Sequence, residues 1–158
     1  MFAIGEYIAH PMHGAGMIDS VVKKKIDGSE RDYYVLKLPV GEMKVMIPVA
    51  GCESIGVRPI ISPDEANSIL ESMAGIDVSM TQNWNKRYRE NMVKIKSGNL
   101  LEVAEVVKGL MLRDADRGLS TGERKMLHSA KQIIISELVI SLKKSYEDIE
   151  ALILNAVS

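Results

Sequence analysis

The sequence predicts an α+β protein, with a β-rich N-terminal part and an all-α C-terminal part. In residues 1–61, β-branched runs alternate with Gly and Pro turns, and Asp27-Gly28 is a strong hairpin signal. Helix-start signals begin at Ser62-Pro63-Asp64-Glu65, where an N-cap serine, a first-turn proline and a capping-box glutamate follow one another. Such signals recur down to the C-terminus. We therefore expect two domains, residues 1–61 and residues 62–158.

The N-terminal part contains five short predicted strands. They cover residues 2–9, 17–26, 31–38, 42–48 and 55–60. Gly and Pro lie between them, as in the predicted turn Pro39-Val40-Gly41. Five short strands cannot form a deep sandwich, so we expect a small, strongly bent barrel of the Tudor/SH3-like kind. Such a barrel keeps open edges, and an open edge can accept an added strand from a partner.

Three consecutive lysines precede the predicted hairpin turn. In a strand, Lys24 faces the side opposite to Lys23 and Lys25, because successive side chains alternate. The triplet cannot therefore point at one partner as a unit. Two interpretations stay open: a charged edge that prevents aggregation, or a basic strand edge used for docking.

The C-terminal part reads as a bundle of about five helices with short loops. The helices are expected over about 63–74, 81–96, 99–117, 121–144 and 145–158. Their predicted N-caps are Ser62, Thr81, Asn99, Ser120 and Ser145, with Ser79 and Gln82 as an alternative capping box for the second helix. Gly75 and Gly118 are predicted stops.

Composition limits the function classes. The apolar and charged fractions, 46% and 26%, are typical of a globular protein, and the net charge of −1 gives no global sign of nucleic-acid binding. Cys52 is the single cysteine, which suits a reducing cytoplasm. The longest apolar run, from Gln132 to Leu142, is too short for a bilayer. We expect a cytoplasmic protein without a membrane partner.

The sequence offers little for catalysis or metal binding. His10, His13 and Cys52 are the obvious soft ligands, and no fourth ligand completes a zinc pattern. No group of residues supplies an acid, a base and an oxyanion donor together. We therefore expect no enzyme activity, no metal, no cofactor and no small-molecule substrate.

The stretch around Trp84 carries the main functional signal. It holds the only tryptophan, followed at once by Lys86, Arg87 and Arg89. Cations near a helix N-terminus oppose the macrodipole, so an anionic partner such as a phosphate backbone would explain them. The ring would then act as an apolar wedge or stacking group. The alternative is a core-facing stripe, which the spacing alone favours, made of Trp84, Tyr88, Met92 and Ile95.

Several longer motifs, in order along the chain, resemble the CarD/CdnL family of bacterial transcription regulators. The N-terminal part resembles a polymerase-interacting module that this family shares with the transcription-repair coupling factor, through residues 5–8, 10–14, 32–36 and 43–48. The C-terminal part carries the more specific motifs, at residues 83–88, 97–98, 103–108 and 117–127.

The resemblance implies a Tudor-like module that docks on the β subunit of RNA polymerase and a helical module that contacts promoter DNA in the minor groove without sequence specificity. It implies that the tryptophan stabilises the open complex at the upstream edge of the melted DNA. The implied DNA-binding residues are Trp84, Lys86, Arg87, Arg89 and Arg124; the implied polymerase-binding residues are Lys24, Ile26, Lys44 and Met46. Met46 departs from relatives that place a cation there, and His10 from relatives with an aromatic residue.

Two rival functions remain. One is an adaptor whose helical part binds another protein, with Trp84 as the interface anchor. The other is a nucleic-acid binder that acts without polymerase. A steep fall of affinity with salt separates DNA contact from the adaptor function.

Overall fold

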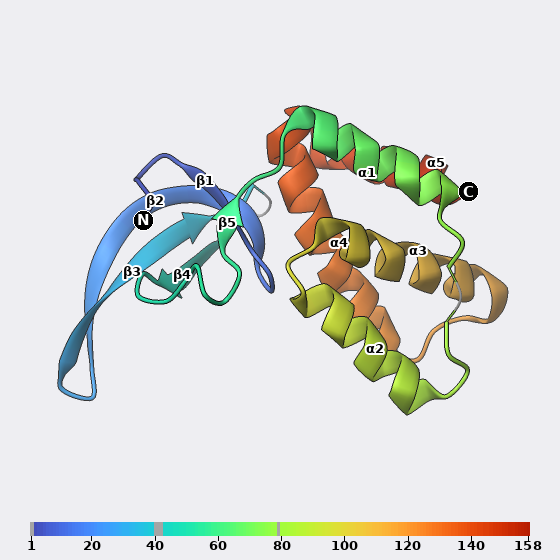
Figure 1. Cartoon of the computed structure of the whole chain (residues 1–158), viewed down its shortest axis with the longest axis horizontal. Helices are drawn as coiled ribbons and strands as arrows, with labels where there is room; N and C mark the ends of the chain where they lie inside the picture. Colours follow the sequence, from blue (N-terminus) through green and yellow to red (C-terminus); the bar gives the residue numbers. More distant parts are fainter. Residues whose placement is uncertain (1, 40–42, 79) are drawn as a thin grey trace.

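The computed structural model describes residues 2–39, 43–78 and 80–158. It confirms the α+β class: strands come first and helices follow (Figure 1). Most of the predicted turn Pro39-Val40-Gly41, the predicted strand start at residue 42 and the alternative cap at Ser79 lie outside the described residues.

The N-terminal part is one bent antiparallel sheet with the strand order β4-β3-β2-β1-β5. Its strands are β1 (Tyr7–His10), β2 (Gly14–Ile26), β3 (Ser29–Lys37), β4 (Lys44–Pro48) and β5 (Arg58–Pro59). The hairpin at Asp27-Gly28 forms as predicted, with φ of 50° and 80° at its two residues. The sheet encloses a small core built of Ile8, Ile18, Tyr34, Leu36, Ile47, Cys52 and Val57.

Two strands are shorter than expected. β1 begins at Tyr7 instead of residue 2, because Gly5 adopts a φ of 92° that interrupts an extended strand. β5 comprises only two residues, because residues 50–56 form turns in which the amide of Gly56 donates to the carbonyl of Glu53. These turns lead the chain directly to the helices.

The helices are α1 (Pro63–Gly75), α2 (Trp84–Lys96), α3 (Leu100–Arg117), α4 (Thr121–Leu142) and α5 (Tyr146–Val157). Four predicted N-caps, Ser62, Asn99, Ser120 and Ser145, accept a backbone N–H. The predicted cap Thr81 is wrong: Asn83 caps α2, and the Thr81 hydroxyl instead donates to Glu90 at 2.9 Å. No helix in the described ranges is long and apolar enough to cross a membrane.

α4 connects the two parts of the molecule (Figure 1). Ile134, Ile135 and Leu138 on α4 are fully buried in the helical core. Ser136, on the side of α4 that meets the sheet, accepts the amide N–H of Ala15 at 2.9 Å. A Cβ at Gly14, whose φ is 86°, would collide with the Ser136 hydroxyl. The backbone of strand β2 therefore packs directly against helix α4.

Candidate functional site

Trp84 is the first residue of α2, and three contacts hold its ring. Asn83 caps the helix beneath it by accepting the amide N–H of Lys86 at 3.0 Å. The indole N–H donates to Ser120 Oγ at 3.0 Å, and the ring stacks on Tyr88 with centroids 5.1 Å apart. An added Cβ at Gly122 would lie 3.4 Å from Trp84 Cζ2, so the ring rests closely on the first turn of α4. Trp84 nevertheless stays 41% exposed.

The core-stripe interpretation is wrong for Trp84. The buried side of α2 is made of Arg87, Asn91 and Ile95, which follow one another at steps of four residues. Tyr88 and Met92 lie beside this stripe and are half-buried. Trp84 thus stands at the margin of the bundle, with part of its ring in solvent.

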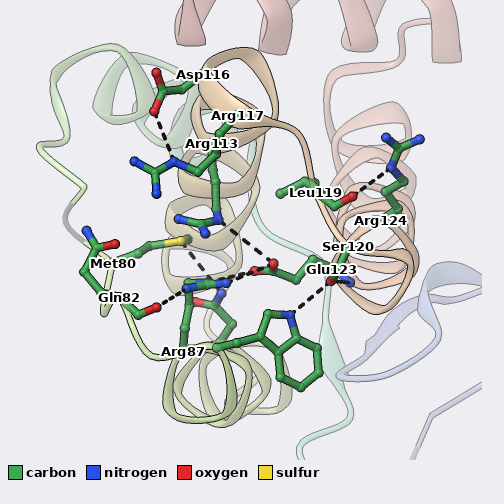
Figure 2. Close-up of polar contacts among 12 residues, drawn as sticks. Met80, Gln82, Arg87, Arg113, Asp116, Arg117, Leu119, Ser120, Glu123 and Arg124 are labelled. Carbon is green, nitrogen blue, oxygen red and sulfur yellow. Dashed lines mark hydrogen bonds and ion pairs between the residues drawn. The ribbon is translucent and has the colours of Figure 1, made fainter.

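Arg87 does not face solvent, and the prediction that it contacts a phosphate is corrected. Its side chain is 2% exposed and forms a bidentate ion pair with Glu123, with nitrogen–oxygen distances of 2.8 and 3.0 Å (Figure 2). Its Nη1 also donates to the carbonyl oxygens of Thr81 and Gln82. The Arg87 nitrogens that make these hydrogen bonds point into the bundle. The ion pair with Glu123 therefore joins α2 to α4.

Electrostatics keep both members of this pair charged. The hydrogen bonds from Arg87 lower the pKa of Glu123, against burial, which acts in the opposite direction. The same hydrogen bonds raise the pKa of Arg87. Arg113 Nε lies 4.0 Å from Glu123 and adds a second positive charge. Arg87 lies one helical turn after Trp84, so this charged pair joins α2 to α4 close to the start of α2.

The other predicted DNA-contacting cations are exposed. Lys86 and Arg89 project from the first turns of α2. Arg124 lies on the first turn of α4, one turn beyond the serine that receives the indole N–H, and its Nε donates to the carbonyl of Leu119 at 3.2 Å (Figure 2). The neighbouring Lys125 is also exposed, although the sequence analysis did not single it out. The half-exposed ring and these cations therefore lie on adjoining first turns of two helices.

The four predicted polymerase-binding residues share one face of the sheet. Leu36, Tyr34 and Ile47 point into the barrel core, so the alternate positions on β3 and β4 point outward. Outward positions on β4 are occupied by Lys44 and Met46, which lie opposite Lys37 and Val35. We call the outward side the outer face, formed by Val22, Lys24, Ile26, Ser29, Arg31, Tyr33, Val35, Lys37, Lys44 and Met46.

The outer face is basic and partly apolar. Ile26 is 46% and Met46 is 36% exposed, so both present apolar surface. Lys44 pairs with Asp19 at 3.3 Å. The sequence alone did not show that Lys24 and Ile26 lie on the same face of the sheet as Lys44 and Met46, because this depends on a strand register that spans two hairpins.

The candidate soft metal ligands, His10, His13 and Cys52, do not form a metal site within the described residues. In residues 2–39, 43–78 and 80–158, no three His, Cys, Asp or Glu side chains are placed to hold a metal ion. The rings of His10 and His13 pack 4.5 Å apart, while Cys52 is buried in the sheet core. His10 Nδ1 accepts the amide N–H groups of Met12 and His13, so it serves the turn.

Comparison with known proteins defines the class. Residues 2–61 match the CarD-like/TRCF RID domain, and residues 68–154 match the CarD C-terminal domain. A sheet module and a helical module in this order are those of a CarD-like transcription regulator. The chain belongs to the CarD family, which is associated with RNA polymerase, and its role is in transcription.

A Bacillus subtilis (strain 168) protein is similar over most of its length. It is named "Putative transcription factor YdeB" and is 36% identical over 140 residues, which cover 89% of this chain and 92% of that protein. The similarity spans both the sheet and the helices.

Proposed function

We propose that this protein binds the β subunit of RNA polymerase through residues 1–61 and stabilises the open promoter complex through residues 62–158. Trp84 acts as a wedge in the minor groove at the upstream edge of the melted DNA. The observation that carries this proposal is a half-exposed indole, held by Ser120 and Tyr88 at a helix start. This role belongs in the cytoplasm, where transcription takes place.

The held ring suits a wedge for an energetic reason. An apolar side chain enters the minor groove only where the step between base pairs is widened, and unstacking costs a few kcal/mol. A ring that is already oriented loses little conformational entropy on insertion. Melted DNA offers the widened step and closed duplex does not, so Trp84 binds the open complex better. Only this difference in affinity shifts the equilibrium towards the open complex.

Exposed cations complete the proposed contact. Lys86, Arg89 and Arg124 are free to reach phosphates on either side of the inserted ring. Arg87 has no part in this contact, since it is buried against Glu123. Three phosphate contacts predict a fall of log affinity for DNA of roughly 0.9 for each contact per decade of salt. A flat salt dependence would instead favour an adaptor that binds protein through Trp84.

The test is the lifetime of the open complex with Trp84→Ala. We expect a lifetime about ten-fold or more shorter than with the wild type, since roughly 1.4 kcal/mol of preferential binding is worth a factor of ten. Val93→Ala, at a 70% exposed position on the same helix, is the matched control and should leave the lifetime unchanged.

Polymerase binding by Trp84→Ala should equal that of the wild type, because the outer face is intact. If the lifetime is the same for Trp84→Ala and the wild type, the wedge is excluded. If polymerase binding also falls, Trp84 contacts protein.

A further inference from the structure

A hollow of about 310 Å³ lies where the chain between α1 and α2 crosses helix α3. The connecting chain contributes Val78, Met80 and Gln82 to its lining, and α3 contributes Gly109, Leu112, Arg113, Asp116 and Arg117. The connecting chain is fastened at both ends of this crossing. Lys108 Nζ donates to the carbonyl of Ile76 at 2.6 Å, and Asn91 Nδ2 donates to Met80 Sδ at 3.9 Å. The walls of the hollow are therefore in place before a ligand arrives.

Part of the lining is apolar. A Cβ at Gly109 would collide with the terminal methyl group of Met80 and crowd Val78, so both side chains lie directly on the backbone of α3. Leu112 follows on the same helix and is 42% exposed. An exposed leucine in a concave surface is stabilised when an apolar group covers it. The hollow thus favours a ligand with an apolar face.

The lining also carries more positive than negative charge. Arg113 Nε lies 4.0 Å from Glu123, whose two oxygens already accept hydrogen bonds from Arg87. Within the part of the chain that the structure describes, this buried Nε has no hydrogen-bond acceptor. Arg117 pairs with its neighbour Asp116 at 3.4 Å, but both side chains are more than half exposed, so this pair is weak.

The two arginines share one side of α3. Arg113 and Arg117 are four residues apart, a spacing at which like charges on a helix repel each other. Figure 2 shows both side chains projecting from α3 towards Met80 and Gln82. An anionic group in the hollow would relieve this repulsion. Guanidinium groups bind phosphate through paired hydrogen bonds, so a phosphate ester is the anion that suits them best.

We propose that this hollow binds a nucleoside phosphate, with Arg113 and Arg117 on the phosphate and Leu112 and Met80 against the base. The base N–H groups and the ribose hydroxyls can donate to the Asp116 carboxylate, which would repel inorganic phosphate. Pockets for small ligands begin at about 300 Å³, so the hollow admits a single nucleotide.

This site goes beyond the proposed DNA contact. The residues that hold the Trp84 ring are Ser120, Tyr88 and Gly122, and they are different from the residues that line the hollow. Binding of a nucleotide can therefore be measured without polymerase and without promoter DNA.

The experiment titrates the full-length chain with guanosine monophosphate, adenosine monophosphate and inorganic phosphate by isothermal titration calorimetry. Arg117→Gln is compared with Lys144→Gln, which removes the same charge at an exposed position beyond the end of α4. We expect Arg117→Gln to weaken nucleotide binding about ten-fold and Lys144→Gln by less than about two-fold. Leu112→Ser should weaken nucleotide binding about three-fold or more and leave the affinity for inorganic phosphate unchanged. Thermal unfolding of each variant checks that the bundle is intact.

Four results would overturn the nucleotide site. Neither nucleotide may give a saturable signal with the wild type, or Arg117→Gln and Lys144→Gln may lose affinity equally, which would mean only long-range attraction. Inorganic phosphate that binds as tightly as the nucleotides, with no effect of Leu112→Ser, would mean an adventitious ion only. Promoter duplex that displaces the nucleotide from the wild type, and binds Arg117→Gln more weakly, would assign the two arginines to DNA. The first three results leave the proposed function of Trp84 standing, since that function is tested by the lifetime of the open complex.

Discussion

Arg58 and Glu137 form a bidentate ion pair between the sheet and the helical bundle, with nitrogen–oxygen distances of 2.7 and 3.0 Å. Glu137 lies on α4 and is 1% exposed. Its Oε2 also accepts the amide N–H of Ile61 at 2.9 Å, and Arg58 Nε donates to the carbonyl of Gly98 at 3.3 Å. The Glu137 carboxylate thus links α4 to strand β5 and to the residues just before α1. Its partner Arg58 also reaches the turn between α2 and α3. This cluster therefore links the sheet to α4 and to the turn that follows α2, the helix that carries Trp84.

Replacing Glu137 with Gln should loosen this junction. Glutamine can still accept from Ile61, but Arg58 loses its counter-charge. Because Arg58 keeps some solvent contact, we expect a loss of about 1–3 kcal/mol in the free energy of unfolding, measured by urea denaturation. Residual dipolar couplings should also show a wider range of orientations between sheet and bundle.

Ser141→Ala is the control for that change, since Ser141 donates to the carbonyl of Ile61 at 2.9 Å without touching the ion pair. It should keep the dipolar couplings of the wild type. Unchanged couplings and stability in Glu137→Gln would mean that packing alone orients the two parts.

Ser120 should determine the position of the indole. Its Oγ accepts both the amide N–H of Glu123 at 3.2 Å and the Trp84 indole N–H at 3.0 Å. Ser120→Ala removes the oxygen that accepts both hydrogen bonds, so we expect about 1 kcal/mol less stability and greater solvent exposure of the ring. The protein has one tryptophan, so acrylamide quenching of its fluorescence reports on this ring directly and should increase.

Ser120→Asp retains an acceptor and should quench like the wild type. Ser145→Ala, which removes the equivalent cap of α5, should lower stability without changing the quenching. Equal quenching in Ser120→Ala and wild type would mean that Tyr88 alone holds the ring.

The Arg87–Glu123 pair should be costly to break and inexpensive to replace. Arg87→Met leaves the buried Glu123 carboxylate with only Arg113, at 4.0 Å, as a counter-charge, so we expect a loss of about 3 kcal/mol in the free energy of unfolding. The double variant Arg87→Met with Glu123→Leu should recover part of this loss, because the buried pair is gone, although Arg113 loses its contact with Glu123. Urea denaturation of both variants gives the comparison, and a double variant no more stable than Arg87→Met would contradict it.

His10 should contribute to acid sensitivity. Burial, followed by the nearby His13, lowers the pKa of His10 to about 4. The unfolded chain binds the proton at the ordinary pKa of 6.5, so the unfolded state holds more protons between these values. The stability from neutral His10 is therefore complete above about pH 6.5 and is lost as the pH falls towards about 4.

His10→Asn keeps a side-chain acceptor for the turn and should show a shallower decline of the urea midpoint over this pH range. His128→Asn, at an exposed position, should decline like the wild type. Equal slopes in all three proteins would assign the acid sensitivity to other groups.

The sequence predicted the elements better than the site. Four helix caps and the Asp27-Gly28 hairpin follow from local chemistry, and all of them form. The burial of Arg87 could not be predicted from the sequence, because its partner Glu123 lies 36 residues away. Helical periodicity assigns apolar residues, and not an arginine, to the buried face of a helix. The two candidate buried stripes of α2, one through Trp84 and one through Arg87, are offset by about one residue. The buried ion pair shows that the stripe through Arg87 is the one that faces the core.

The close approach of Gly14 to Ser136 restricts how this protein could be recombined with its relatives. A chimera that joins the sheet of one relative to the helices of another would need glycine at the first of these positions and a short side chain at the second. Exchange of the two halves should therefore succeed only between parents that carry a compatible residue pair at this seam.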